Sequence, residues 1–229
     1  MPPATACSPA SAAYIQHDLR EMTMKSQPDL ATTHSADLTE PRVAIIVGST
    51  RPGRKADAVA RWVLNIAARR DDATFEVVDI ADHALPHLDE PMPPRGGQYT
   101  HAHTHAWAQR IKSFDAYVFV TPEYNGSIPG VLKNAIDFLY AEWNDKVAGF
   151  VGYGIQGGTR AVDDLRRIVS DLNVTGVHPT AALTFAEDFQ DYTQFTPSDP
   201  QEKNITTMLD ELVTQAFSLR PAAPAEPTP

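Results

Sequence analysis

The most constraining feature of this sequence is an alternation of short apolar runs with segments of helical periodicity. The apolar runs lie at 43–48, 74–80, 116–120, 146–154 and 180–185. The first is β-branched and apolar at consecutive positions, which is typical of a strand buried on both faces. Apolar residues recur at steps of three and four within 59–67, 129–140, 161–172 and 205–217, and more weakly around 99–113. These segments are predicted to be amphipathic helices.

Five buried strands separated by helices predict an α/β fold with a parallel sheet covered on both faces. Right-handed crossovers restrict the topology to a doubly wound three-layer sandwich. Five strands fit the flavodoxin-like order better than the six-stranded dinucleotide-binding fold. Such sheets bind ligands beyond the carboxyl ends of strands one and three, where the strand order reverses. The loops that follow these two strands are therefore the first places to look for a site.

The ends of the chain differ in composition from its centre. Residues 1–40 are rich in Ala, Ser, Thr and Pro and are predicted to be a disordered extension, and 221–229 form a Pro/Ala-rich tail. The folded domain is placed at 41–220. The sole cysteine, Cys7, can form no internal disulfide, which fits a reducing compartment. We see no stretch long enough to cross a bilayer and no secretory signal, so a cytoplasmic protein without membrane contact is expected.

The loop after the first strand gathers positive charge in an acidic chain. The formal net charge is -10, yet Arg51, Arg54 and Lys55 follow the first apolar run within five positions. A helix N-terminus offers unpaired N–H groups to an anion, and Ser49 and Thr50 add hydroxyls. The loop is predicted to bind a phosphate monoester. The acidic balance argues against a general nucleic-acid binder, which needs a basic face.

Two known phosphate-binding motifs do not fit this loop. Gly48 and Gly53 have P-loop spacing, but the lysine comes one position late, at Lys55, and no hydroxyl residue occupies the magnesium-ligand position. The dinucleotide fingerprint fails because Thr50 stands at its second glycine, and Asp79, at the end of the second strand, lies beyond the usual spacing. A solvated basic turn without a ligand stays open as an alternative.

The loop after the third strand, "TPEYNGSIPG" (121–130), has the composition of a binding loop. Two prolines and two glycines make its turn sharp and rigid. Tyr124 offers an aromatic face and Asn125 an amide, and loop aromatics of this kind can lie against a flat heterocycle. Backbone groups around 123–126 are expected to meet the polar edge of such a ring.

Together, "GSTRPGR" and "TPEYNGSIPGVLKNAIDFL" resemble the NAD(P)H-dependent FMN reductase family, which includes quinone, azo-dye and chromate reductases. The resemblance covers roughly 42–185, and "PEYN" with the following "PGVLKNAID" is its most specific part. It implies a flavodoxin-like fold, one non-covalent FMN per subunit, and NADPH or NADH as the electron donor. It also implies homodimers or homotetramers with active sites near the subunit interfaces.

The resemblance also implies the cofactor contacts. Ser49, Arg51 and the 53–56 turn would hold the FMN phosphate, the 122–125 segment would line the isoalloxazine, and the loop "GYGIQGGTR" (152–160) would supply a third contact region. Many relatives have a serine where Gly152 stands, and Arg160 is expected to face either a neighbouring subunit or water. The predicted cofactor-binding residues are Ser49, Thr50, Arg51, Gly53, Arg54, Lys55, Ala56, Pro122, Glu123, Tyr124, Asn125, Gly126, Gly154, Gly157 and Gly158.

The function expected from this resemblance is transfer of two electrons from NAD(P)H to a quinone, flavin or similar small acceptor, in ping-pong order. No side chain is assigned as a catalytic acid or base, because the flavin N5 carries the hydride. One alternative is a flavin reductase that supplies reduced FMN to a partner monooxygenase. Others are a non-enzymatic FMN electron carrier, whose phosphate loops typically lack cations, and a flavin-free regulatory descendant.

Histidines and large aromatics provide further candidates. His101, His103 and His105 alternate, but only His101 and His105 would share a helix face, and no acidic or cysteine partner is clearly placed to complete a metal shell. No metal site is predicted. Trp107 and Trp143 are interpreted as packing or interface residues rather than as part of a substrate pocket.

Overall fold

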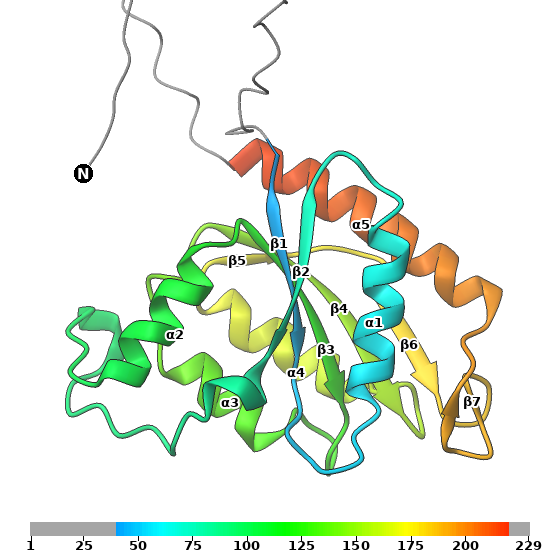
Figure 1. Cartoon of the computed structure of the whole chain (residues 1–229), viewed down its shortest axis with the longest axis horizontal. Coiled ribbons are helices and arrows are strands. Elements are labelled where there is room, and N and C mark those ends of the chain that lie inside the picture. Colours follow the sequence, from blue (N-terminus) through cyan, green and yellow to red (C-terminus); the bar gives the residue numbers. More distant parts are fainter. Residues whose placement is uncertain (1–39, 220–229) are drawn as a thin grey trace, which may run out of the picture. The chain divides into compact units, whose positions relative to one another are not determined.

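A parallel sheet runs through the part of the chain that the computed structural model describes, residues 40–219 (Figure 1). Its strands are β1 (Arg42–Val47), β2 (Thr74–Asp79), β3 (Ala116–Pro122), β4 (Lys146–Gly154), β5 (Val174–Gly176) and β6 (Ala181–Thr184). The strand order is β2-β1-β3-β4-β5, and β6 also pairs with β4. This order confirms the predicted flavodoxin-like fold. The predicted extension before residue 40, Cys7 and the predicted tail at 221–229 lie outside the described residues.

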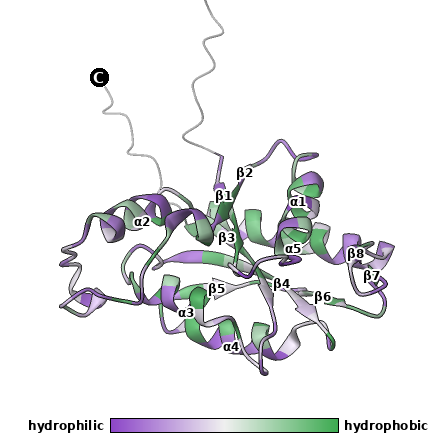
Figure 2. Cartoon of the chain, turned by 60° about the horizontal axis from the view of Figure 1, so that its bottom comes forward, coloured by the Kyte–Doolittle hydropathy of each residue, from purple (hydrophilic) through white to green (hydrophobic). Residues whose placement is uncertain are grey.

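Helices cover both faces of the sheet. They are α1 (Ala56–Ala67), α2 (Ala102–Lys112), α3 (Gly130–Asp137), α4 (Thr159–Ser170) and α5 (Asp199–Leu219), with 3-10 turns η1 (Ile80–His83) and η2 (Pro94–Gly96). Alternate residues of β1 enter separate cores: Val43 and Ile45 pack with α1 and α5, whereas Ala44 and Ile46 pack with α2, α3 and α4. Figure 2 shows both hydropathy colours along the helices, as expected of amphipathic helices in the outer layers.

The far edge of the sheet departs from the prediction of one strand at 180–185. The structure places β6 there, but a shorter strand, β5, precedes it and pairs with the first residues of β4. Pro179 lies between the two segments and has no N–H to donate to a sheet ladder. The edge beside β4 is therefore built from two short pieces. A small hairpin of β7 (Phe189–Gln190) and β8 (Gln194–Phe195), which the sequence did not predict, then leads to α5.

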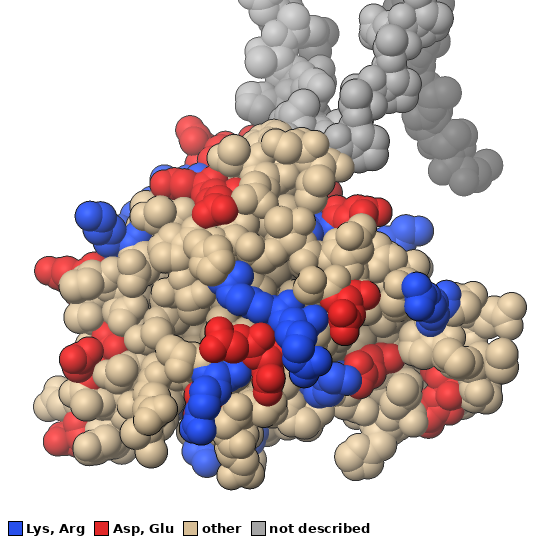
Figure 3. All heavy atoms as spheres, turned by 180° about the vertical axis from the view of Figure 1, so that it is seen from behind, with Lys and Arg blue, Asp and Glu red and all other residues tan. Residues whose placement is uncertain are grey.

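The two tryptophans assigned to packing are core residues. Trp107 and Trp143 are 0% and 1% exposed, and their indole N–H groups donate to the Ala135 and Ile136 carbonyls of α3 at 2.8 and 3.1 Å. On the face shown in Figure 3, Lys and Arg side chains lie beside Asp and Glu side chains. None of the helices between residues 40 and 219 combines the length and apolar character that a membrane span requires.

A buried carboxylate fastens the segment between β6 and α5. Asp188 is 0% exposed and accepts hydrogen bonds from the Thr184 N–H (2.9 Å) and from the Ser198 N–H and hydroxyl (both 3.1 Å). Asp188→Ala leaves these donors unsatisfied, so we expect the free energy of unfolding in urea to fall by about 2 kcal/mol. Glu187→Ala, at the exposed neighbouring position, is the control and should change it by less than about 0.5 kcal/mol. Equal effects of the two substitutions would contradict this role for Asp188.

Candidate functional site

Three loops meet at the carboxyl edge of the sheet: 48–55 after β1, 123–129 after β3 and 155–158 after β4. After β1 the chain continues to β2 on one side of the sheet, and after β3 it continues to β4 on the other side. The strand order therefore reverses between β1 and β3. Backbone hydrogen bonds extend the pairing beyond the strands, from Gly48 N to Val120 O (2.9 Å) and from Glu123 N to Tyr153 O (3.1 Å). The structure thus brings together the three segments that the sequence had singled out.

The loop after β1 has a geometry that could hold an anion. Ser49 is 0% exposed, and its hydroxyl lies 3.1 Å from the Tyr124 hydroxyl and accepts a bond from Arg51 N at 3.4 Å. Gly53, at φ +70°, turns the chain toward α1. Lys55, at the N-cap position of α1, makes no side-chain cap hydrogen bond, so the positive dipole end of this helix could face a ligand.

The three cations of this loop are not equivalent. Arg54 donates to both carboxylate oxygens of Asp79, to Asp57 at 2.9 Å and to the Ser49 carbonyl. Burial lowers the pKa of Arg54, but its hydrogen bonds and the charges of Asp79 and Asp57 outweigh this and raise the pKa above its ordinary value. Arg54 therefore fastens the loop to the end of β2.

Arg51 and Lys55 differ from Arg54 in having no carboxylate partner within 40–219. Arg51 is exposed, and its guanidinium lies 5.9 Å from the centre of the Tyr124 ring. Lys55 stands at the N-cap position of α1. Two cations that have no carboxylate partner in this part of the chain thus flank the start of α1 in sequence, which is a suitable environment for a dianionic phosphate.

The loop after β3 is a tight hairpin. Tyr124 and Ser127 exchange backbone hydrogen bonds of 2.9 and 3.1 Å. The turn residues Asn125 and Gly126 both have positive φ, +52° and +81°, as a type I′ turn requires and as an Asn-Gly pair favours. This turn projects Asn125 into solvent while Pro122 stays buried in the sheet. Tyr124 is thus fixed at its hydroxyl by Ser49 and at its backbone by the hairpin.

Glu123 joins the second loop to the third. Its carboxylate accepts bonds from the Arg160 backbone N–H (3.2 Å) and from the Arg160 guanidinium (Nε at 2.9 Å). The glutamate side chain is 9% exposed and that of Arg160 is 62% exposed. The carboxylate therefore serves as an anchor and as a cap in the first turn of α4. The sequence had left Arg160 to a neighbouring subunit or to water; within this chain its partner is Glu123.

Glycines in the loop after β4 allow close packing within the protein. A Cβ atom at Gly158 would lie 2.5 Å from Tyr153 N, and one at Gly157 would lie 2.9 Å from the Ala182 Cβ. A Cβ at Gly152 would come within 2.7 Å of the Gly157 carbonyl oxygen, which explains the absence of a serine here. Close packing therefore accounts for Gly152, Gly157 and Gly158, but not for Gly154, where a Cβ atom would lie an ordinary 3.5 Å from the Glu123 Cβ. A ligand contact at Gly154, Gly157 or Gly158 stays a prediction.

Tyr153 is a site residue that the sequence analysis missed. It is 3% exposed at the end of β4, and the Ala56 N–H, in the first turn of α1, donates a hydrogen bond to its hydroxyl. Burial, followed by the neighbouring Tyr124, raises the pKa of Tyr153 above its ordinary value. The hydroxyl thus stays protonated near neutral pH. Its position on an apolar strand gave no sign of a polar role.

The alternating histidines His101, His103 and His105 lie at the start of α2. His101 precedes the helix, and its ring stacks on that of His103 at 5.2 Å. His103 Nε2 lies 3.0 Å from an Asp89 carboxylate oxygen. Within residues 40–219 no group of three or more His, Cys, Asp or Glu side chains is arranged to hold a metal ion.

Comparison with known proteins shows which proteins the chain is similar to. The sequence profile of a family described as NADPH-dependent FMN reductase matches residues 41–190. An NAD(P)H-dependent FMN reductase of Schizosaccharomyces pombe is 39% identical over 150 residues, covering 65% of this chain and 75% of that protein. A quinone reductase of Escherichia coli K12 is 36% identical over 138 residues, covering 56% and 69%. Among solved structures, the NAD(P)H:acceptor oxidoreductase FerB of Paracoccus denitrificans has a TM-score of 0.62 at 24% identity, covering 78% of this chain and 98% of that one.

Proposed function

The chain belongs to the NADPH-dependent FMN reductase family, and from that premise we propose that it passes two electrons from NAD(P)H to a small acceptor such as a quinone. It is an oxidoreductase that uses FMN and NAD(P)H. For a quinone, NADPH and one proton would give NADP⁺ and the hydroquinone. We further propose ping-pong order, in which the oxidised nucleotide leaves before the acceptor enters, because both need the same exposed ring face.

One observation carries the assignment of the FMN site: Arg51 and Lys55 lack carboxylate partners in the described chain and lie in the loop that leads into α1. Their charge and the N–H groups of α1 fit the phosphate of FMN. The Tyr124 ring, fixed by Ser49 and by the 124–127 hairpin, offers a flat surface to the isoalloxazine. The exposed Asn125 and the backbone of Gly126 are the proposed contacts for its polar edge.

The protein itself would bind FMN, orient its ring and adjust the electrostatic environment at the ring edge. Bound FMN would supply the hydride-transfer chemistry. Arg54 holds the phosphate loop through Asp79, and Glu123 holds the second and third loops together through Arg160. We assign no side chain as a general acid or base. Backbone N–H groups of the hairpin would stabilise negative charge at the ring edge, an electrostatic effect that needs donors fixed in advance.

The test is anaerobic mixing of purified protein, reconstituted with FMN, with NADPH or NADH, followed by steady-state turnover with a quinone. Loss of the oxidised-flavin absorbance and parallel double-reciprocal plots are expected. A non-enzymatic carrier would not oxidise the nucleotide rapidly with a quinone alone. A flavin-supplying reductase would release FMN on gel filtration and turn over free FMN as a substrate. Light scattering on the same sample tests the proposed homodimer or homotetramer.

Asp79→Asn tests the fastening of the phosphate loop. The asparagine Oδ1 still accepts from Ala81 N, as Asp79 does at 2.9 Å, but the charge opposite Arg54 is lost. We expect the FMN dissociation constant to rise about five-fold, equivalent to about 1 kcal/mol for a weakened ion pair. The measurement is fluorescence titration. Asp164→Asn, which removes a carboxylate that pairs with Arg167 and not with a cation of the loop after β1, should bind FMN like the wild type. An unchanged affinity in Asp79→Asn would refute the role of its ion pair with Arg54.

A further inference from the structure

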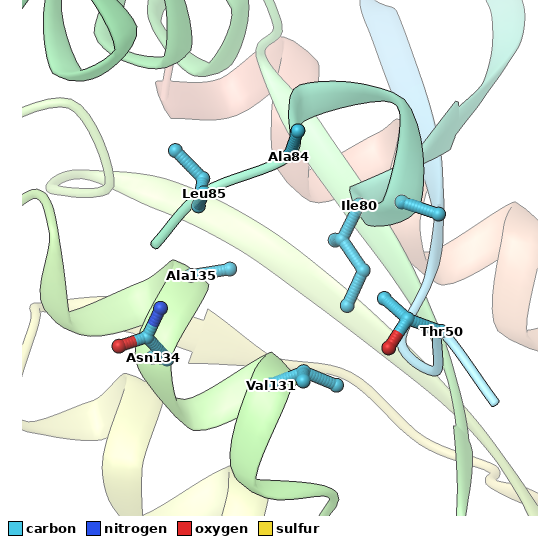
Figure 4. Close-up of a pocket in the computed structure, with 8 residues that line it drawn as sticks. Thr50, Ile80, Ala84, Leu85, Val131, Asn134 and Ala135 are labelled. Atoms are coloured by element: carbon cyan, nitrogen blue, oxygen red, sulfur yellow. The ribbon is translucent and has the colours of Figure 1, made fainter. Parts of the chain in front are cut away.

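A cavity beside the phosphate loop belongs to none of the predicted FMN contacts except Thr50. Its volume is about 250 Å³, and it lies between the turn that follows β2 and helix α3 (Figure 4). Thr50 stands on one side, with Leu85 and Asn134 opposite it, and the Ile80 side chain is directed between them. The lining residues are Thr50, Ile80, Ala81, Ala84, Leu85, Val131, Asn134 and Ala135.

The chemistry of this lining is apolar and uncharged. Asn134 is polar, but both ends of its amide are already engaged: Nδ2 donates to the Pro86 carbonyl at 2.7 Å, and Oδ1 accepts from Leu88 N at 3.0 Å. The exposed hydroxyl of Thr50 is then the polar side-chain group left to a ligand. A charged group in this cavity would lose hydration and gain no partner of opposite charge.

Exposed apolar side chains extend the apolar surface beyond the cavity. Val131, which lines it, is 42% exposed, and so is Leu88, whose backbone is bonded to Asn134. Surface leucine and valine side chains next to an apolar cavity favour an apolar ligand. The Pro86–Leu88 segment is fixed on α3 by Asn134, so the cavity is formed before any ligand enters.

We propose that this cavity binds the uncharged ring system of the electron acceptor, with one hydrogen bond to Thr50, and thereby selects neutral one- or two-ring acceptors over anionic ones. This inference rests on the proposed function, because Thr50 places the cavity next to the proposed FMN site. The phosphates of the pyridine nucleotide are not expected in this cavity, because its lining includes no cation.

The experiment is calorimetric titration of the protein, with saturating FMN present, using 2-naphthol and 2-naphthalenesulfonate as redox-inert probes that share one ring system and differ in charge. We expect wild type to bind 2-naphthol at least ten-fold more tightly than the sulfonate. Ala81→Phe fills the cavity from an exposed position and should weaken 2-naphthol binding at least ten-fold. Val131→Phe fills the cavity from the opposite wall and should weaken 2-naphthol binding to the same degree. It replaces the first variant if Ala81→Phe folds poorly. The control is Ala68→Phe, at an exposed position at the other end of α1.

Turnover separates this inference from the proposed function. With 1,4-naphthoquinone as acceptor, Ala81→Phe should lower kcat/KM about ten-fold while the KM for NADPH stays unchanged. Wild-type binding of 2-naphthol in both variants, or equal binding of the sulfonate, would overturn the cavity assignment even if turnover persists. Loss of 2-naphthol binding in the variants, without turnover by any form of the protein, would support the cavity and reject the proposed function instead.

Discussion

Replacing Arg51 and Lys55 together by glutamine is expected to weaken FMN binding about 100-fold. Each side chain lacks a carboxylate partner in the described chain, so neither substitution breaks an ion pair within that part of the protein. A charge-assisted hydrogen bond to phosphate contributes about 1.5–3 kcal/mol, and part of the loss will be made up by the α1 N–H groups. Fluorescence titration of FMN into the apoprotein measures the effect, and the wild-type affinity should fall as salt rises.

The matched control removes the same two charges elsewhere. Lys112→Gln with Lys203→Gln changes the net charge equally, at exposed positions on α2 and α5. This double variant should bind FMN within about two-fold of the wild type, since exposed charges beyond a Debye length are largely screened. If both double variants lost affinity to the same degree, net charge rather than a local phosphate site would explain the result.

Gly158→Ala is expected to lower the free energy of unfolding by about 4 kcal/mol. Its φ of +70° is strained for alanine, and the added Cβ would lie 2.5 Å from Tyr153 N and 2.9 Å from the Gly152 carbonyl carbon. These neighbours are backbone atoms of β4, so the loop and not a side chain must move. Urea unfolding followed by circular dichroism measures the change.

Gly53→Ala is the control that separates the cost of steric contact from the cost of the strained backbone conformation. Gly53 has the same φ, +70°, but a Cβ there would meet nothing within 4 Å. Only the conformational strain remains, so we expect a loss of about 1 kcal/mol. If Gly158→Ala cost no more than Gly53→Ala, the packing of the third loop against β4 would not be the reason for its glycines.

The order of β2, β1, β3 and β4 was predictable because each of these strands is marked by its own apolar run. The continuous apolar run "VAIIVG" (43–48) predicted β1 without any information on its partners, and the 121–130 loop follows β3 as expected. The split edge was not predictable in this way. Strand β5 has only three residues, Val174–Gly176, and its pairing depends on β4 rather than on its own composition.

The partners of the site residues were the main gap in the sequence analysis. Arg54 and Asp79 are 25 positions apart and meet because β1 and β2 pair in parallel and end side by side. Their positions after neighbouring strands were the available signal. Glu123 and Arg160 meet for the same reason across β3 and β4. The cavity beside Thr50 could not be predicted from a sequence pattern, since its lining comes from three separate segments.

The most direct test of the central claim compares FMN with riboflavin, which has the same ring system without the phosphate. If Arg51, Lys55 and the start of α1 bind the phosphate, FMN should bind wild-type protein at least about 100-fold more tightly than riboflavin. That preference should largely disappear in the Arg51→Gln/Lys55→Gln variant. Equal affinity of the folded wild-type protein for both flavins, or binding of neither, would contradict the account.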